Sequence, residues 1–229
     1  MPEVKNERAR LRVRLLAAAL LLASAAWMRA EKQPQPLPKA FHANTYPAHE
    51  SHEEEKVSIA VDPYDMPDKA AIFVVNYKDS GFLPMQFIVS NDGEQPLSLV
   101  DMEVELITAD RSKIPPATPD DLYRRLGRQT RRGDEPARNP LPVPLPRKKV
   151  KATVSKEAQE EIESMQFRAR AVEARSLQSG FLIFDVAGIA NPLAGAHLYV
   201  HGLRDQNGKE LFYFEIPLEK YLTYRPGHP

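Results

Sequence analysis

Short stretches of alternating apolar and polar residues recur along the chain, as expected of strands that bury one face. Residues 99–108 alternate most regularly, with four apolar residues on one face and three acidic residues on the other. They are Val100, Met102, Val104 and Leu106 against Asp101, Glu103 and Glu105. A period of two with a polar outer face is typical of an antiparallel sheet that packs on one side only.

Six further stretches predict strands, most of them rich in apolar and β-branched residues and bounded by turn residues. They cover residues 57–61, 69–77, 82–90, 180–186, 196–203 and 210–218. The last two flank Asp205-Gln206-Asn207-Gly208, and Asn-Gly favours the positive φ angles of a hairpin turn. Strands of this number and spacing predict a mainly β fold, an immunoglobulin-like antiparallel sandwich.

Residues 110–170 interrupt these strands and predict a helical, proline-rich insertion. Thr118-Pro119-Asp120-Asp121 is a good helix start, since Thr caps free amides, Pro suits the first turn and the acids complement the helix dipole. We expect this helix to run to about Gly127, and a second, weakly amphipathic helix to run from near Ser155 to Arg170. Between them, prolines at every second position from 140 to 146 require an extended chain.

The strand segments together resemble a known group of domains. Tyr77–Asn91, Leu99–Thr108, Ser179–Val186 and the closing hairpin are similar to the exported bacterial immunoglobulin-like domains of telokin-like type, and the whole looks like an uncharacterised exported bacterial family. The resemblance covers roughly residues 57–222. It implies a fold and an extracytoplasmic address and carries no known activity. The chain departs from the group by lacking a lipobox cysteine and by carrying the insertion.

The first thirty residues have the order of a secretory signal peptide. Four arginines at alternate positions from Arg8 to Arg14 precede the apolar run 15–28, and small residues and prolines follow. A membrane-spanning helix needs about 20 apolar residues, so this run is short for a permanent anchor. Ala23-Ser24-Ala25 offers small residues for cleavage, which we expect after Ala25. An uncleaved N-terminal transmembrane anchor within residues 1–30 and a buried core helix are the alternatives.

These features predict export to the periplasm, or tethering to the inner membrane if the signal stays uncleaved. The full chain has a formal net charge of zero, and removal of residues 1–25 would leave a mildly acidic protein of about −3. Nucleic-acid-binding proteins need clustered positive charge, so this balance argues against a nucleic-acid partner. The chain has no cysteine, which excludes a lipobox anchor, disulfides and thiolate metal sites.

Residues 31–56 predict a tether between the export segment and the sandwich of residues 57–224. Its first part is proline-rich, and its second part concentrates histidine and glutamate. His42, His49 and His52 are the candidate metal ligands, because imidazole and carboxylate bind zinc, copper or nickel. On a helical turn His49 and His52 could reach one ion. A solvated linker without metal is the alternative interpretation.

Two smaller groups carry candidate chemistry. His197 and His201 flank Tyr199 on one face of a predicted strand, where they would form either a metal site or the wet face of a sandwich whose core Leu198 and Val200 fill. The segment 62–68 holds three aspartates, which suit calcium, but its spacing is not that of a calcium loop and its two prolines favour a rigid turn.

A basic run lies inside the insertion and is diluted by Asp134 and Glu135. It consists of Arg124, Arg125, Arg128, Arg131, Arg132, Arg138, Arg147, Lys148, Lys149 and Lys151. Such a run could contact anionic lipid head groups or an acidic envelope polymer, or it could be a solvated loop. The alternating prolines of residues 140–146 could act as a docking ligand or as a rigid crossover.

Sequence signatures of enzymes are absent: there is no nucleophile elbow, Gly-rich phosphate loop or His-Glu-x-x-His motif. We therefore expect an exported binding or structural module of the cell envelope without catalysis or cofactor. Its working surface is expected in residues 110–152, since functional residues favour loops on a rigid scaffold. An envelope protein or an anionic polymer is the expected partner. The rival hypothesis is a periplasmic metal-binding protein that uses His42, His49 and His52.

Overall fold

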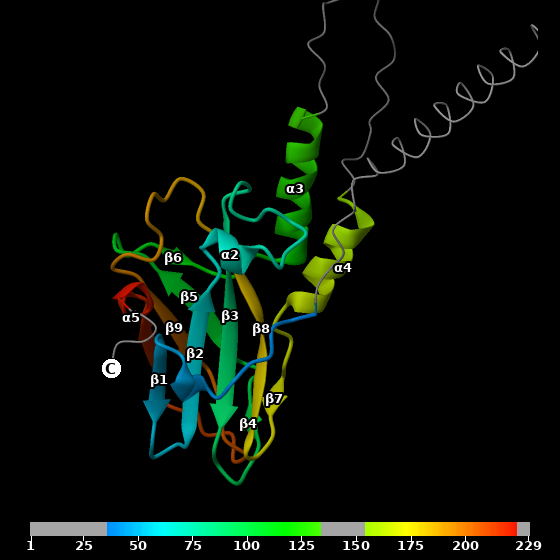
Figure 1. Ribbon diagram of the computed structural model, residues 1–229. Coiled ribbons are helices and arrows are strands. Elements are labelled where there is room, and N and C mark those ends of the chain that lie inside the picture. Colours follow the sequence, from blue (N-terminus) through cyan, green and yellow to red (C-terminus); the bar gives the residue numbers. More distant parts are fainter. Residues whose placement is uncertain (1–35, 134–153, 224–229) are drawn as a thin grey trace, which may run out of the picture. The chain divides into compact units, whose positions relative to one another are not determined.

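The computed structural model describes residues 36–133 and 154–223, and within these ranges the chain is mainly β. Two four-stranded antiparallel sheets dominate them (Figure 1). The first sheet has the strand order β1-β2-β3-β8, which are His49–His52, Val57–Pro63, Phe82–Asn91 and Ser176–Asp185. The second has the order β10-β9-β5-β6, which are Phe214–Pro217, His197–His201, Glu103–Ile107 and Lys113–Ile114. A short pair joins β4 (Leu97–Ser98) to β7 (Ala171–Val172).

The two sheets pack face to face across a hydrophobic core, in a sandwich-like arrangement. In Figure 1, β2 and β3 lie in front of β5 and β9. The first sheet contributes Ile59, Met85 and Phe87 to this core, and the second contributes Leu106 and Leu198, all with no exposed surface. Burial of this much apolar area is the main favourable term in the folding of such a domain.

The first sheet is covered on both faces, and for this reason all ten residues of β3 are buried. On the face that points away from the second sheet, Ala43 of the 3-10 helix η1 (Ala43–Thr45) packs against Ala60 and Ile88. Further along, that face meets the helices α3 (Pro119–Gly133) and α4 (Lys156–Met165). Leu122, Ile162, Met165, Phe181 and Ile183 form this second cluster. A strand buried on both sides needs no alternation of apolar and polar residues, which explains the largely apolar sequence of β3. Its polar residues Gln86, Ser90 and Asn91 are buried as well and form hydrogen bonds.

The second sheet is different, because its outer residues reach solvent. Strands β5, β9 and β10 alternate between buried and partly or fully exposed positions. Leu198 and Val200 fill the core, as the sequence predicts, and the residues between them point outward. The predicted hairpin is also confirmed, since β9 and β10 pair in antiparallel register and Gly208 has φ = 78°.

Both predicted helices of the insertion are present, with different ends. Helix α4 begins after Ser155, whose hydroxyl accepts a hydrogen bond from the amide of Ala158, but it stops at Met165 rather than near Arg170. Helix α3 runs past the predicted end at Gly127 to Gly133. Residues 113–114 form β6 beside β5, so the second sheet extends into the predicted insertion. The proline-rich residues 140–146 lie outside the described residues.

The strand predicted over residues 69–77 is wrong. The helix α2 (Pro67–Ala70) and a series of turns take its place. The amides of Val74 and Val75 donate to the side-chain carboxylate of Glu161, and Phe73 and Tyr77 pack into the cluster beside α4. The apolar residues of this stretch are therefore buried by a helix and a loop rather than by sheet pairing. Periodicity alone does not separate these two outcomes in a short apolar run.

The predicted tether is also wrong for residues 43–56. Residues 43–45 form η1, and β1 pairs with β2 from His49 to His52. Ala43 and Ala48 have no exposed surface, so small side chains that look unremarkable in a polar stretch complete the packing of the first sheet. A polar sequence can form the edge strand of a sheet because its backbone forms the hydrogen bonds of the sheet while its side chains remain exposed to solvent.

The strand predicted over residues 99–108 is shorter than expected. It covers only Glu103–Ile107, and Val100 is 56% exposed in the turn before it. The helix α5 (Glu219–Thr223) ends the described part of the chain. Across the described residues, no helix has the length and apolar character needed to cross a membrane. The export segment 1–30 lies outside these residues.

Candidate binding cleft

A cleft of about 500 Å³ opens at the end of the sandwich where β3 begins and β8 ends. The loop between β8 and β9 forms one wall with residues 186–194, and Phe82, Leu83 and Leu222 contribute apolar side chains. Polar groups stand at the rim, on Tyr64, Asp65 and Lys78. A largely apolar cleft of this size with a few polar groups is the usual form of a small-molecule binding site.

Small residues bring the walls of the cleft together. Gly81 has φ = 77°, and a Cβ atom there would lie 2.8 Å from the Cβ of Ala187. Only glycine adopts this backbone conformation readily, and it also allows the start of β3 to approach the loop. The sequence patterns did not predict this site. The available signal is the run of small residues and the single proline in residues 187–196, which predicts a loop and says nothing about what the loop faces.

A network of polar contacts supports the rim. Lys69 forms an ion pair with Asp62, and its Nζ lies 5.1 Å from the ring centroid of Tyr64 and 4.8 Å from that of Tyr221. The hydroxyl of Tyr221 donates to Oδ1 of Asp65 over 2.7 Å. These contacts tie α2 and α5 to the end of β2 and so fix the position of Tyr64 and Asp65 in the cleft wall.

The two phenols of this network hold their protons tightly. Burial raises the pKa of Tyr64 to about 12, and the negative charge of Asp62 acts in the same direction. Burial also raises the pKa of Tyr221, and its hydrogen bond to the Asp65 carboxylate adds to the effect. Near neutral pH both phenols are protonated, so they can donate hydrogen bonds but are poor bases.

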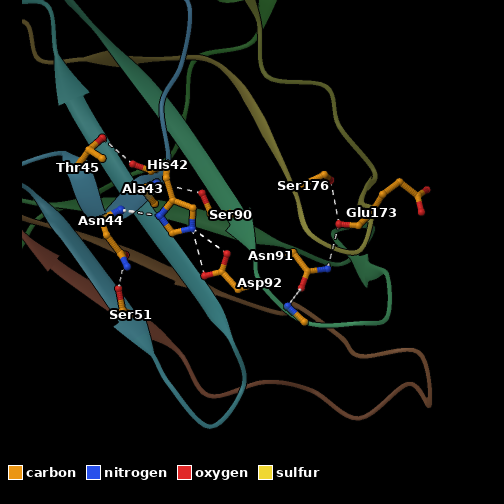
Figure 2. Close-up of polar contacts among 11 residues, drawn as sticks. His42, Ala43, Asn44, Thr45, Ser51, Ser90, Asn91, Asp92, Glu173 and Ser176 are labelled. Carbon is orange, nitrogen blue, oxygen red and sulfur yellow. Dashed lines mark hydrogen bonds and ion pairs between the residues drawn. The ribbon is translucent and has the colours of Figure 1, made fainter.

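The structure does not bring His42, His49 and His52 together. Nε2 of His42 lies 2.9 Å and 3.1 Å from the two carboxylate oxygens of Asp92, and Nδ1 accepts from the amide of Asn44 (Figure 2). Beside it, the amide of Ala43 donates to the hydroxyl of Ser90. His42 thus joins the start of the described chain to the end of β3.

His49 and His52 point to opposite faces of β1, because side chains three apart in a strand alternate. Nδ1 of His49 lies 2.5 Å from the carbonyl of Tyr46. His52 lies between two carboxylates, 3.4 Å from Glu50 and 3.1 Å from Glu55, and its ring stacks on Phe214 with 3.9 Å between centroids. Nowhere in the described ranges do three or more His, Cys, Asp or Glu side chains gather as a metal site would require.

The remaining candidates from the sequence are dispersed. His197 and His201 point outward from β9 and lie beside Glu215 and Glu103, at 3.3 Å and 3.5 Å. In the segment 62–68, the Asp62 and Asp65 side chains engage Lys69 and Tyr221 instead of converging with Asp68 on one point.

Two residues of the basic run are described in full. Arg124 forms an ion pair with Asp121. Arg125 forms a bidentate ion pair with Asp185, and its guanidinium lies 4.9 Å from the ring centroid of Phe82. The contacts of Arg125 hold α3 against the end of β8 and the start of β3. The side chains from Arg128 to Arg132 and the cations from Arg138 to Lys151 lie outside the described residues.

No protein-family model matches the chain, and no curated protein matches it in sequence. A 2.2 Å crystal structure of a conserved hypothetical protein from Bacillus anthracis is a structural neighbour. The alignment covers 71% of this chain and 87% of the Bacillus anthracis chain. The two share 10% identity with a TM-score of 0.28.

Proposed function

We propose that the protein is an exported, non-catalytic binding module of the cell envelope, built on an immunoglobulin-like sandwich of the telokin-like type. The observation that carries this proposal is the cleft between the β8–β9 loop and the start of β3. It offers an apolar interior with Tyr64, Asp65 and Lys78 at its rim. The ligand that fits is a small molecule with an apolar body and one polar or charged end.

The chemistry of the rim supports binding over catalysis. The nearby acids Asp62 and Asp65 contact Lys69 and Tyr221, and the phenols of Tyr64 and Tyr221 titrate well above neutral pH. A general acid or base works best with a pKa close to the working pH. The export segment of residues 1–30 supports the address.

Dye binding tests the cleft. The anionic apolar dye 1-anilinonaphthalene-8-sulfonate should bind the purified protein with a saturable rise in fluorescence. Ala190→Trp places a large side chain in the cleft wall and should weaken this binding at least tenfold, whereas Ala171→Trp on the exposed side of β7 should not. Equal dye affinity of the two variants would remove the support for a binding module at this site.

Fractionation tests the address separately. We expect the protein in the periplasmic fraction with an N-terminus at residue 26, measured by N-terminal sequencing. Recovery of the full-length chain from the cytoplasm would contradict export, whatever the cleft binds.

A further inference from the structure

Outward residues of the second sheet and the two residues just before β10 form a connected group of aromatic rings. Tyr199 lies at the centre of β9, with its ring centroid 5.4 Å from that of His201 and 5.2 Å from that of Tyr213. Tyr213 stacks on Phe212, with 4.7 Å between the centroids. Phe212 is 64% exposed and Tyr213 is 40% exposed. Contiguous exposed aromatic side chains of this kind are typical of interaction sites.

Carboxylates surround these rings. The strand register places Tyr199 between Glu105 of β5 and Glu215 of β10. Glu103 occupies the next outward position of β5, opposite His201, and its side chain is 73% exposed. A cation that binds to the rings would therefore meet negative charge on both sides.

Two more carboxylates come from the neighbouring β1–β2 hairpin. Glu50 accepts a hydrogen bond from the amide of Glu215, and Glu55 accepts one from the amide of Phe212 over 3.0 Å. Lys113 offsets part of this charge through a 2.7 Å ion pair with Glu105. The acidic aromatic face consists of Glu50, Glu55, Glu103, Glu105, Tyr199, His201, Phe212, Tyr213 and Glu215.

The same chain contains a segment with the complementary chemistry. Residues 140–146 alternate proline with Leu and Val, and Arg147, Lys148, Lys149 and Lys151 follow. Proline-rich segments dock on aromatic surfaces at a low cost in entropy, because proline already restricts the backbone. The adjacent cations would meet both the carboxylates and the faces of the rings.

We infer that the acidic aromatic face binds the proline-rich basic segment 140–151 of a second copy of the chain. The segment lies between α3 and α4, which pack on the first sheet, whereas the acidic aromatic face lies on the second sheet. Since both helices that flank the segment pack on the sheet opposite this face, we assign the contact to a second copy and not to the same molecule. The contact is heterologous, since the two copies use different surfaces, and it can build chains of molecules.

A peptide titration tests the contact. The receptor is the full chain with Arg147, Lys148, Lys149 and Lys151 each changed to Ser, so that its own segment does not compete. A fluorescent peptide of residues 138–153 should bind this receptor, and the affinity should fall at least tenfold between 50 mM and 500 mM salt. Tyr199→Ala with Tyr213→Ala should weaken binding at least tenfold. Phe41→Ala, which removes a ring that is 61% exposed outside the acidic aromatic face, should leave it unchanged.

Reversing the charges on both the receptor and the peptide separates a loss of binding from a loss of folding, because a misfolded variant would bind neither peptide. The double variant Glu103→Lys with Glu215→Lys should bind the natural peptide at least tenfold more weakly than the original receptor does. A peptide whose four cations are replaced by glutamate should bind this variant better than it binds the original receptor. Sedimentation should show concentration-dependent association of the natural chain and a monomer for the four-serine receptor.

Three results would each overturn the inference. They are equal peptide affinity of the tyrosine variant and the Phe41→Ala control, a natural chain that stays monomeric at all concentrations, and failure of the charge exchange. Binding of chitohexaose at Tyr199 and Tyr213 without peptide binding would assign the face to a glycan and overturn the inference as well. Ala190→Trp should not change peptide affinity, so these outcomes are distinct from those at the cleft.

Discussion

At the residue scale, the carboxylate of Glu161 shows how one buried charge replaces a missing strand. It is 5% exposed on α4 and accepts hydrogen bonds from the amides of Val74 and Val75. Burial and then the charge of Glu161 raise the pKa of the neighbouring Tyr77. Buried amides need acceptors, and here one side chain supplies what a sheet ladder would otherwise provide.

We predict that Glu161→Ala lowers the free energy of unfolding by about 3 kcal/mol, because two amides lose a charged acceptor. Glu161→Gln should cost less, since its carbonyl oxygen still accepts one of the bonds. Urea unfolding measures both. Glu160→Ala, on the exposed side of the same helix, should change stability by less than about 0.5 kcal/mol. A loss below about 0.5 kcal/mol in Glu161→Ala, no larger than in Glu160→Ala, would show that the amide contacts contribute little to stability.

At the scale of elements, the junction of β1 and β10 closes the edge between the two sheets. Strand β10 pairs with β9 on one side. On the other side the amide of Glu215 donates to the Glu50 carboxylate, and just before the strand the amide of Phe212 donates to the Glu55 carboxylate. His52 lies between these carboxylates and stacks on Phe214. Charged side chains at a strand edge hinder pairing with another chain.

We expect Glu50→Ala with Glu55→Ala to aggregate faster than the natural protein at equal concentration, because it exposes unpaired amides at β10. Light scattering during incubation at 37 °C measures the rate. Glu53→Ala, in the exposed turn of the same hairpin, is the matched control. Unchanged aggregation of the double variant would show that the carboxylates do not protect this edge.

The sequence predicts individual helices and strands better than it predicts which of them come into contact. The hairpin of β9 and β10 and the start of α4 near Ser155 depend on local sequence, and the structure confirms them. The turn at 71–77 and the pairing of β1 depend on partners far along the chain, such as Glu161 and β2. The cleft likewise joins the β8–β9 loop to residues more than a hundred positions earlier, so no local pattern predicted it.

At the scale of the whole molecule, several buried phenols link stability to alkaline pH. Burial raises the pKa of Tyr64 to about 12 and also raises the pKa of Tyr77 and Tyr221 above the usual 10.0. The folded state therefore keeps protons that the unfolded state loses above about pH 10. Stability that is fully present below pH 10 must then fall as the pH rises toward 12.

Urea unfolding between pH 8 and pH 11.5 should show this decline. Tyr64→Phe and Tyr221→Phe should each flatten it, because each removes one group that the unfolded state deprotonates first. Tyr213→Phe, which removes a phenol from the exposed surface beside β10, serves as the comparison. A decline that is equally steep in all three variants would assign the alkaline loss to other groups.

The amino-acid sequence by itself determined the β-rich class, the antiparallel hairpin of β9 and β10 and the helices of the insertion. Each depends on neighbours within about ten residues, where period, turn chemistry and capping act directly. Tertiary structure alone decided that the first sheet is covered on both faces while the second keeps an open one, and that His42, His49 and His52 lie apart. Those outcomes depend on which surfaces, far apart in the sequence, come into contact. Burial of apolar area lowers the free energy of the folded chain wherever the contacting residues stand in the sequence, so local patterns do not predict these contacts.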